Sequence, residues 1–321
     1  MADTAVVFGA NGFIGRWISR ALVLDGWRCV DLDRRGRAGG AARDVEAPYY
    51  DGGNWSEVTL TRFLEQFGSV VVINAAGAAW STDAPTVLRD NITWARRLGI
   101  ACEMSESVAE IVHIGSAHEY GELPEGVAVR ESDPLTPDST YASSKSAGAS
   151  YLVRAAYGRD VPIRIVRPFN VVGPGHGSQG LWASAVELYR NALAESSEQV
   201  VASVPRPETT RDFVDVRDVA RLVTLTLGRP DLPLASVYNA GSGEATTIRE
   251  LFDVFREETG IDYQFSSTTM SLRPGSRWQC ADIAKAESEL GWRREFSLLG
   301  SVRASLVLYG KQEDAVFPGK P

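Results

Sequence analysis

The 321-residue chain is short of cysteine, histidine and long apolar runs. Its three cysteines stand far apart, so we expect neither a disulfide framework nor a zinc knuckle. The three histidines also lack metal-ligand spacing, which argues against a metal centre. No segment approaches the ~18 apolar residues of a membrane span, and the first residues contain no signal-peptide core. We therefore expect a cytoplasmic protein with no membrane partner.

Positive charge is also in deficit, because 33 lysines and arginines face 41 acidic residues, giving a net charge of -8. Such a surface repels phosphate backbones, so we expect no nucleic-acid partner. A small phosphorylated substrate is not excluded, since a few arginines in a cleft suffice to bind one. The chain is 44% hydrophobic and 23% charged, which is typical of a globular protein long enough to bury a sizeable core.

The first half alternates short apolar runs with helical segments, which predicts an α/β fold with a doubly wound parallel Rossmann sheet. We expect residues 1–168 to form a dinucleotide-binding domain. Residues 169–321 are expected to form mainly a smaller α/β substrate domain, with a segment near 213–240 returning to the first. The runs predicted as strands are Thr4–Phe8, Cys29–Leu32, Val70–Ile73, Ile111–Ile114 and Ile163–Val166.

A glycine-rich loop joins the first predicted strand to the first helix, with the spacing Gly-x-x-Gly-x-x-Gly. Glycines there allow a tight turn and the close approach of a pyrophosphate, and the helix N-terminus supplies free N–H groups and a positive dipole end. The strand before and the helix after the loop favour a dinucleotide site over a structural turn. The residues expected to contact the cofactor are Gly9, Asn11, Gly12, Phe13, Ile14 and Gly15.

The cofactor could be NAD or NADP. Asp33 ends the second strand 18 residues after Gly15, where an acid binds the ribose hydroxyls of NAD. Asp31 is the competing acid. Arg34 follows at once and could instead bind the 2′-phosphate of NADP. Asp33 therefore favours NAD, and Arg34 keeps NADP open.

Tyr141 and Lys145 form the second signal. Ser139 or Thr140 can cap a helix there, so the two side chains would lie one turn apart on one face. An ammonium near a phenol favours the phenolate, and we expect the pKa of Tyr141 to fall from about 10 toward neutrality. Such a tyrosine can exchange a proton with a substrate oxygen while hydride moves at the attached carbon. The structural alternative is a surface helix pair.

Ser116 follows the strand Ile111–Ile114 at its carboxyl end, where open α/β sheets bind ligands. Its hydroxyl can hold the reacting oxygen beside Tyr141. The alternative is a serine that only caps a helix or turn.

These residues and the glycine loop resemble the short-chain dehydrogenase/reductase superfamily. The chain length and C-terminal half are similar to its extended branch, the NAD-dependent epimerase/dehydratase family acting on nucleotide sugars. The resemblance implies that Tyr141 is the acid/base, Lys145 binds the nicotinamide ribose and Ser116 polarises the substrate oxygen. It rests on Gly9–Gly15, Asn74–Gly77, Ser116–Gly121, Tyr141–Lys145, Arg167–Asn170, Arg211–Ala220, Tyr238–Gly243 and Ala281–Trp292.

The resemblance implies further contacts. Phe169 is expected on the nicotinamide side and Asn170 at the sugar diphosphate. Arg211 and Arg273 suit a dianionic diphosphate, which guanidinium binds through two parallel hydrogen bonds; the alternative is an ion pair with a nearby acid such as Asp212 or Asp215. The family commonly dimerises through two helices, so we expect a homodimer. The other expected cofactor contacts are Asp44, Val45, Ala75, Ala76, Gly77 and Pro168.

The residues after Ser116 bear on the reaction. Related 4,6-dehydratases carry Asp-Glu where this chain has Ala117 and His118, which argues against dehydration and decarboxylation. His118 could serve as an acid/base, but we favour a substrate-contacting, cleft-lining histidine. The motifs resemble most the GDP-4-keto-6-deoxy-D-mannose reductases and related nucleotide-sugar 4-ketoreductases. We predict C4 reduction of a GDP- or dTDP-linked 4-keto-6-deoxyhexose; the alternatives are a 4-epimerase with tightly held NAD and a non-catalytic dinucleotide-binding protein.

Overall fold

The centre of the molecule is a sheet of seven strands in the order β11-β6-β5-β4-β1-β2-β3. The computed structural model describes residues 3–32, 38–39, 55–79, 83–177, 179–204, 206–266 and 277–308. Neighbouring strands run parallel except at the edge, where β3 pairs antiparallel with β2. The strands are β1 (Thr4–Phe8), β2 (Arg28–Leu32), β3 (Ala38–Gly39), β4 (Val70–Asn74), β5 (Val108–Ile114), β6 (Ile163–Pro168) and β11 (Ala235–Ala240).

The five predicted strands are confirmed, and several extend beyond the apolar runs that predicted them. The β5 strand, for example, begins at Val108 and takes in Glu110 and His113. The β1 and β4 strands are buried at every position because helices cover both faces of the sheet. The β1 strand pairs with both β2 and β4, so the strand order reverses there, which is where doubly wound sheets open a ligand crevice.

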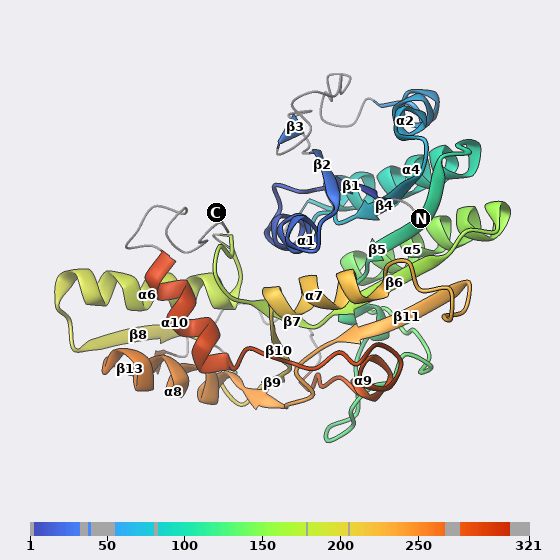
Figure 1. Cartoon of the computed structure of the whole chain (residues 1–321). Coiled ribbons are helices and arrows are strands. Elements are labelled where there is room, and N and C mark those ends of the chain that lie inside the picture. Colours follow the sequence, from blue (N-terminus) through green and yellow to red (C-terminus); the bar gives the residue numbers. More distant parts are fainter. Residues whose placement is uncertain are drawn as a thin grey trace.

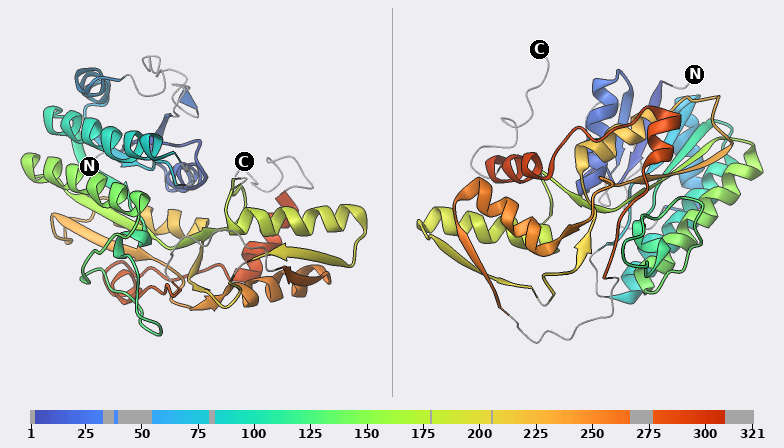
Figure 2. Two further views of the ribbon diagram at one scale, coloured as in Figure 1. Left: turned by 180° about the vertical axis from the view of Figure 1, so that it is seen from behind. Right: turned by 90° about the horizontal axis from the view of Figure 1, so that it is seen from below.

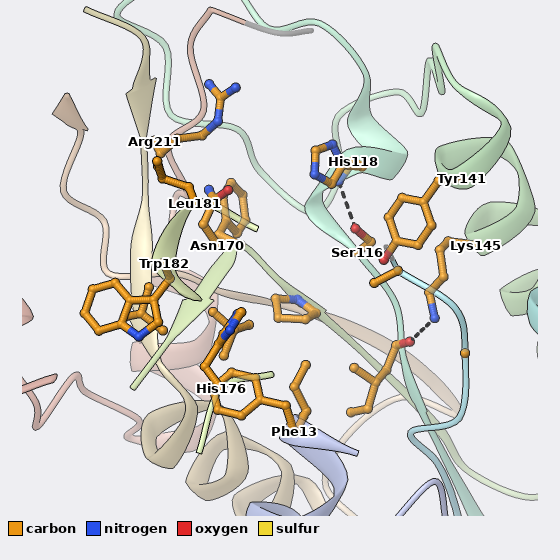
Figure 3. Close-up of a pocket in the computed structure, with 18 of the residues that line it drawn as sticks. Phe13, Ser116, His118, Tyr141, Lys145, Asn170, His176, Leu181, Trp182 and Arg211 are labelled. Atoms are coloured by element: carbon orange, nitrogen blue, oxygen red, sulfur yellow. Dashed lines mark hydrogen bonds between the residues drawn. The ribbon is translucent and has the colours of Figure 1, made fainter. Parts of the chain in front are cut away.

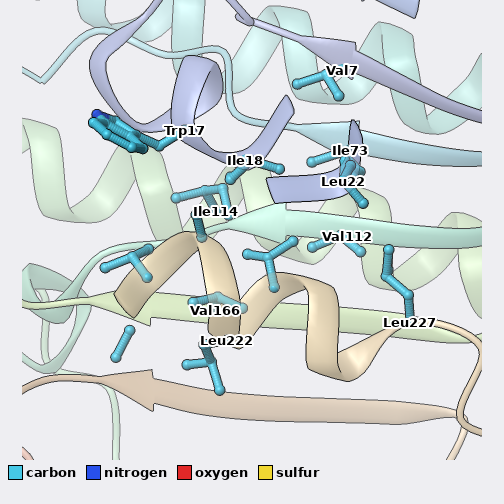
Figure 4. Packing of buried hydrophobic residues seen from close by; sticks show 14 of the residues in the cluster. Val7, Trp17, Ile18, Leu22, Ile73, Val112, Ile114, Val166, Leu222 and Leu227 are labelled. Atoms are coloured by element: carbon cyan, nitrogen blue, oxygen red, sulfur yellow. The ribbon is translucent and has the colours of Figure 1, made fainter. Parts of the chain in front are cut away.

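Helices pack on both faces of the sheet (Figure 1). One core cluster joins α1 (Phe13–Leu24) and α7 (Val216–Thr226) to the sheet through residues such as Ile18, Ile114 and Leu222, which are labelled in Figure 4. The other face is covered by α2 (Glu57–Leu64), η2 (Glu65–Phe67), α3 (Ala84–Leu88), η3 (Arg89–Thr93), α4 (Trp94–Met104) and α5 (Thr140–Arg159).

The chain leaves the sheet after β6 and later returns to it. The returning segment is β10 (Phe213–Asp215), α7 and β11, which pairs in parallel with β6. Helix α9 (Ala284–Leu290) then packs against β11 and α7. The sheet is thus completed by residues far along the chain, and the α/β Rossmann class predicted from the sequence is confirmed.

A second, smaller core lies at one end of the molecule, where the views of Figures 1 and 2 agree. Its aromatic centre includes Trp182, Tyr189, Phe252 and Phe255. Short pairs, β7 (Asn170–Val172) with β10 and β9 (Thr210–Arg211) with β12 (Thr246–Thr247), lie between the two cores. Around the second core lie α6 (Leu181–Glu195), β8 (Gln199–Ser203), α8 (Ile248–Thr259), β13 (Asp262–Ser266) and α10 (Leu298–Leu308).

Two further findings concern the helices. Trp94 and Leu98 on α4 are 8% and 0% exposed and belong to the core cluster on one face of the sheet. Among the described residues, no helix combines the length and the apolar character needed to cross a bilayer.

The glycine loop is held by close main-chain packing. Gly9 has φ +85°, and a Cβ on Gly15 would lie 2.2 Å from the Gly9 carbonyl oxygen.

We predict that Gly15→Ala lowers the free energy of unfolding by about 1–3 kcal/mol, because neither main-chain segment can move freely. Urea unfolding measures the loss. The matched control is Gly177→Ala, where a Cβ meets no atom within 4 Å. Equal stabilities of the two variants would contradict this packing.

Candidate active site

A cavity of about 520 Å³ opens at the carboxyl ends of the sheet strands and extends toward the second core. Its size is that of a typical cofactor or substrate pocket. Figure 3 shows Ser116, His118, Tyr141 and Lys145 on one side of it, and Phe13, Asn170, His176 and Arg211 facing them. The predicted residues that line it are Phe13, Ile14, Ala75, Ala76, Gly77, Ser116, His118, Tyr141, Lys145, Pro168, Phe169, Asn170 and Arg211.

The glycine loop lies next to this cavity. The Gly12 N–H donates to the Gly9 carbonyl at 2.8 Å, and Gly12 is the N-cap of α1 without any side-chain cap. The first N–H groups of α1 therefore remain available to an anion. A Cβ on Gly9 would lie 2.7 Å from the Ala76 nitrogen, so only glycine lets the loop pack against the end of β4. Gly9, Asn11, Gly12 and Gly15 shape this wall without lining the cavity itself.

Asp31, the competing acid, is engaged inside the fold, where its Oδ1 accepts from the Ser19 hydroxyl at 2.5 Å. Burial raises the pKa of Asp31, and this hydrogen bond partly offsets the rise. Five predicted contacts, Asp33, Arg34, Asp44, Val45 and Arg273, lie outside the described residues.

Helix α5 places Tyr141 and Lys145 one turn apart. The Ser139 hydroxyl caps the helix by accepting from the Ala142 N–H at 3.1 Å, as predicted. Figure 3 shows the Tyr141 hydroxyl beside the Ser116 side chain, and the rings of Tyr141 and His118 meet edge to face at 5.8 Å. The surface-pair alternative is excluded, because both Tyr141 and Lys145 line the cavity.

The expected lowering of the Tyr141 pKa is wrong. Burial raises the pKa of Tyr141 above its usual value of 10, the hydrogen bond from Ser116 opposes that rise, and the charge of Glu119 adds to it. The Lys145 ammonium instead donates to the Ile114 carbonyl at 2.6 Å, and burial lowers the pKa of Lys145 to about 8. Desolvation of the phenolate thus outweighs any help from Lys145. Tyr141 is a neutral phenol at pH 7, able to donate a proton.

Ser116 caps a turn, which is the structural role considered for it. Its hydroxyl accepts from the His118 N–H at 3.2 Å and caps η4 (Ala117–Tyr120). Its side chain also lies beside Tyr141 at the cavity. The Ser116 N–H donates to the Glu119 carboxylate at 2.8 Å, which completes a capping box. The local turn therefore sets the direction of the Ser116 side chain.

Asn91 is a site residue that the sequence reasoning missed. It lies in the π-helical η3, and its side chain bonds both the N–H and the C=O of Ala78 at 2.9 and 3.2 Å. Its amide also donates to the Ser144 hydroxyl at 2.9 Å, which in turn donates to the Tyr141 carbonyl. Asn91 thereby ties the loop after β4 to α5. The sequence itself shows only an asparagine within a helical segment, because its burial becomes visible in the structure.

On the opposite wall, Arg211 donates to the Thr210 carbonyl at 2.8 Å. Within the described part of the chain it forms no salt bridge, because Asp212 accepts main-chain N–H groups and Asp215 pairs with Arg217. The ion-pair alternative is therefore wrong for Arg211. Burial lowers the pKa of Arg211 to about 10, so it stays cationic at pH 7.

Asn170 and His118 differ in how freely they reach the cavity. The Asn170 amide is partly engaged, donating to the Asp212 carbonyl at 3.0 Å and to Gln279 at 3.2 Å. His118 lines the cavity. Burial first and the charge of Arg211 second lower the pKa of His118, while Asp138 opposes them, so the imidazole is neutral at pH 7.

Comparison with known proteins agrees with this geometry. The model of the "NAD dependent epimerase/dehydratase family" matches residues 5–241. The chain belongs to this family. The predicted family and its nicotinamide cofactor are thereby confirmed. Over most of its length the protein is similar to a dehydrogenase, to a reductase and to solved structures of nucleotide-sugar complexes.

One relative is the dTDP-6-deoxy-L-talose 4-dehydrogenase (NAD(P)(+)) of Kitasatospora kifunensis, 32% identical over 302 residues that cover 92% of each chain. The GDP-6-deoxy-D-mannose reductase of Pseudomonas aeruginosa is 24% identical and covers 95% of this chain and 97% of its own. A solved structure, MoeE5 in complex with UDP-glucuronic acid and NAD, is 26% identical with a TM-score of 0.76, covering 95% of this chain and 98% of that one.

The buried ammonium gives the site a measurable stability cost. Because the pKa of Lys145 is about 8 when folded and 10.5 in the open chain, the unfolded state binds more protons between these values and stability rises with pH. We predict that Lys145→Met is more stable than the wild type by up to about 3 kcal/mol at pH 7, and that the gain vanishes towards pH 10.5.

Urea unfolding at several pH values measures this difference. Lys285→Met is the matched control, because Lys285 also donates to a main-chain carbonyl, at 2.8 Å, but lies outside the active-site cavity. A Lys145→Met protein that is less stable than the wild type at pH 7 would show that the buried ammonium carries no such cost.

Proposed function

We propose that the protein reduces the C4 ketone of a nucleotide-linked 4-keto-6-deoxyhexose, with Tyr141 as the proton donor. The observation that carries the proposal is the placement of Ser116, Tyr141 and Lys145 on one side of a cavity that the glycine loop borders. A bound NADH or NADPH supplies the hydride that C4 receives. The C4 oxygen takes the phenolic proton, so the ketone becomes a secondary alcohol and the cofactor is oxidised.

Ser116 and Tyr141 act on the same substrate oxygen in this proposal. The Ser116 hydroxyl holds the C4 oxygen, and Tyr141 delivers its proton as negative charge develops there. A phenol with a raised pKa is protonated at pH 7, which is the form needed for reduction. Lys145, cationic below pH 8, lies where it can bind the nicotinamide ribose and later help to restore the proton.

The cofactor site proposed here follows the glycine loop. The N–H groups at the start of α1 suit the pyrophosphate. Ala75, Ala76, Gly77, Pro168 and Phe169 line the cavity where the nicotinamide would lie. Both NAD and NADP remain in the proposal, since the name of the Kitasatospora relative carries both.

Among the described residues that line the site, none is the additional carboxylate that elimination of water needs. Ala117 is buried, and His118 takes the next position with a neutral imidazole. The adjacent Glu119 has both oxygens engaged, one by the Ser116 N–H and one by Arg167. These contacts favour simple carbonyl reduction over dehydration or decarboxylation.

Arg211 supports a diphosphate substrate. Its guanidinium faces the cavity, is half-buried and lacks an acidic partner within the described part of the chain. A buried, unpaired cation gains most from a doubly charged ligand. The name of the Kitasatospora relative makes a dTDP-linked sugar the first candidate and a GDP-linked sugar the second.

We predict that Tyr141→Phe lowers kcat by a factor of about 10² to 10⁴, because the proton donor is lost. The dissociation constant for NADH should stay within about twofold, as the phenol mainly serves the sugar. Tyr157→Phe is the matched control, on the same helix but 59% exposed. Undiminished turnover in Tyr141→Phe would remove this tyrosine from the reaction.

The same assay separates the reductase from a 4-epimerase. A ketoreductase consumes one reduced cofactor for each sugar reduced, whereas an epimerase returns its cofactor unchanged. Stoichiometric loss of NADH or NADPH absorbance with the 4-keto sugar supports the reductase. Interconversion of two 4-hydroxy sugars without net cofactor consumption would establish the epimerase instead.

We predict that Arg211→Met raises KM for the nucleotide sugar by about tenfold or more and leaves the NADH dissociation constant unchanged, because one charge-assisted contact is lost. Steady-state kinetics and cofactor titration measure both quantities. The control is Arg303→Met, which removes a surface arginine paired with Glu258. An unchanged KM in Arg211→Met would mean that the diphosphate binds elsewhere.

A further inference from the structure

Glu119 is a fully buried carboxylate beside the cavity that the proposed proton transfer does not use. Its Oε1 accepts from the Ser116 N–H at 2.8 Å, and its Oε2 accepts from Arg167 Nε at 3.0 Å. A Cβ on Gly115 would lie 2.6 Å from Oε1. The carboxylate therefore packs directly against the main chain that leads into Ser116.

Arg167 is itself held in place from two sides. Its Nη1 donates to the Tyr120 hydroxyl at 3.1 Å, and its guanidinium lies 4.9 Å from the centre of the Tyr120 ring. The Tyr120 hydroxyl donates to Asn239 on β11 at 2.7 Å. The network thus spans η4, β6 and β11, and every member is buried. A carboxylate bound this way has one available position.

We propose that Glu119 is the positioning residue of this site, fixing the main chain of Ser116 through its bond to Arg167 and placing one negative charge close to Tyr141 and Lys145. The proposal deepens the function proposed above and rests on it, because it concerns the residue that donates the proton. Glu119 itself touches neither the cavity nor any reacting atom.

The charge of Glu119 acts on both members of the pair on α5. It raises the pKa of Tyr141 and also opposes the lowering of the pKa of Lys145 by burial. Both effects favour the protonated forms, which are those a ketone reduction needs. The other ionisable groups around this cluster are Arg167 from β6, Tyr120 and His118 from η4, His113 from β5, Arg211 from β9, and Glu131 and Asp138 from the segment between η4 and α5.

Two variants separate the geometry from the charge. Glu119→Gln keeps the length of the side chain and removes the charge, whereas Glu119→Asp keeps the charge and shortens the side chain by one methylene. We expect Glu119→Gln to move the loss of reductase activity at high pH downward by about one pH unit. We expect Glu119→Asp to lower kcat about tenfold without moving that loss, because Ser116 is misplaced.

The matched control is Glu110→Gln. Glu110 on β5 pairs at 3.2 Å with Arg164 on β6, the strand that also carries Arg167, and both side chains are buried, but the pair lies outside the cavity. A merely structural role for Glu119 would lower stability as Glu110→Gln does and leave the pH profile where it is in the wild type.

A second readout does not require turnover. The ¹³C resonance of Tyr141 Cζ, assigned by its loss in Tyr141→Phe, should titrate at lower pH in Glu119→Gln than in the wild type. Wild-type protein that reduces no 4-keto sugar would overturn the proposed function, and this titration would still decide the role of Glu119. The inference is overturned if Glu119→Gln leaves the titration and the pH profile unchanged. Should Glu119→Gln not fold, wild-type kcat in Glu119→Asp would overturn it.

Discussion

The placement of the half-buried Tyr141 phenol beside the Ser116 side chain is the feature around which the site is arranged. Partial loss of the water that would stabilise a phenolate raises the pKa of Tyr141, so the proton stays on the oxygen. The Lys145 ammonium, one turn along the same helix, is directed to the end of β5 instead of to the phenol. The proton donor Tyr141 and the cation Lys145 thus lie side by side, and burial of the ammonium lowers the stability of the fold.

The sheet provides the rigid frame for this pair. Ser116 follows β5, and Phe169 and Asn170 follow β6. The carboxyl ends of these parallel strands therefore place residues from both walls of the cavity at the same edge of the sheet. The fold then crosses to the second core through β7 and β10, and Asp212 fastens the crossing by accepting from the main-chain N–H groups of Ser242, Gly243 and Ala281. Arg211, the next residue back along the chain, is thereby held facing the cavity.

Much of this arrangement could be predicted from the sequence, because its signals are local. Continuous apolar runs marked the buried strands, the glycine spacing marked the loop before α1, and Ser139 marked the start of α5. The failures were of another kind. The pKa of Tyr141 depends on how far the folded chain excludes water, and the partners of Glu119 and Asn91 lie dozens of residues away in sequence. A short sequence motif determines neither how far a side chain is buried nor which distant residues become its hydrogen-bond partners.

The central claim is that C4 of a sugar receives hydride while Tyr141 gives a proton to its oxygen. The direct test is to mix reduced cofactor that carries deuterium at both positions of its reactive carbon with a dTDP- or GDP-linked 4-keto-6-deoxyhexose. Mass spectrometry and NMR of the product locate the label. We expect one deuterium, bound to C4 of the reduced sugar. A reduced sugar that carries no deuterium, or carries it at another carbon, would contradict this reaction.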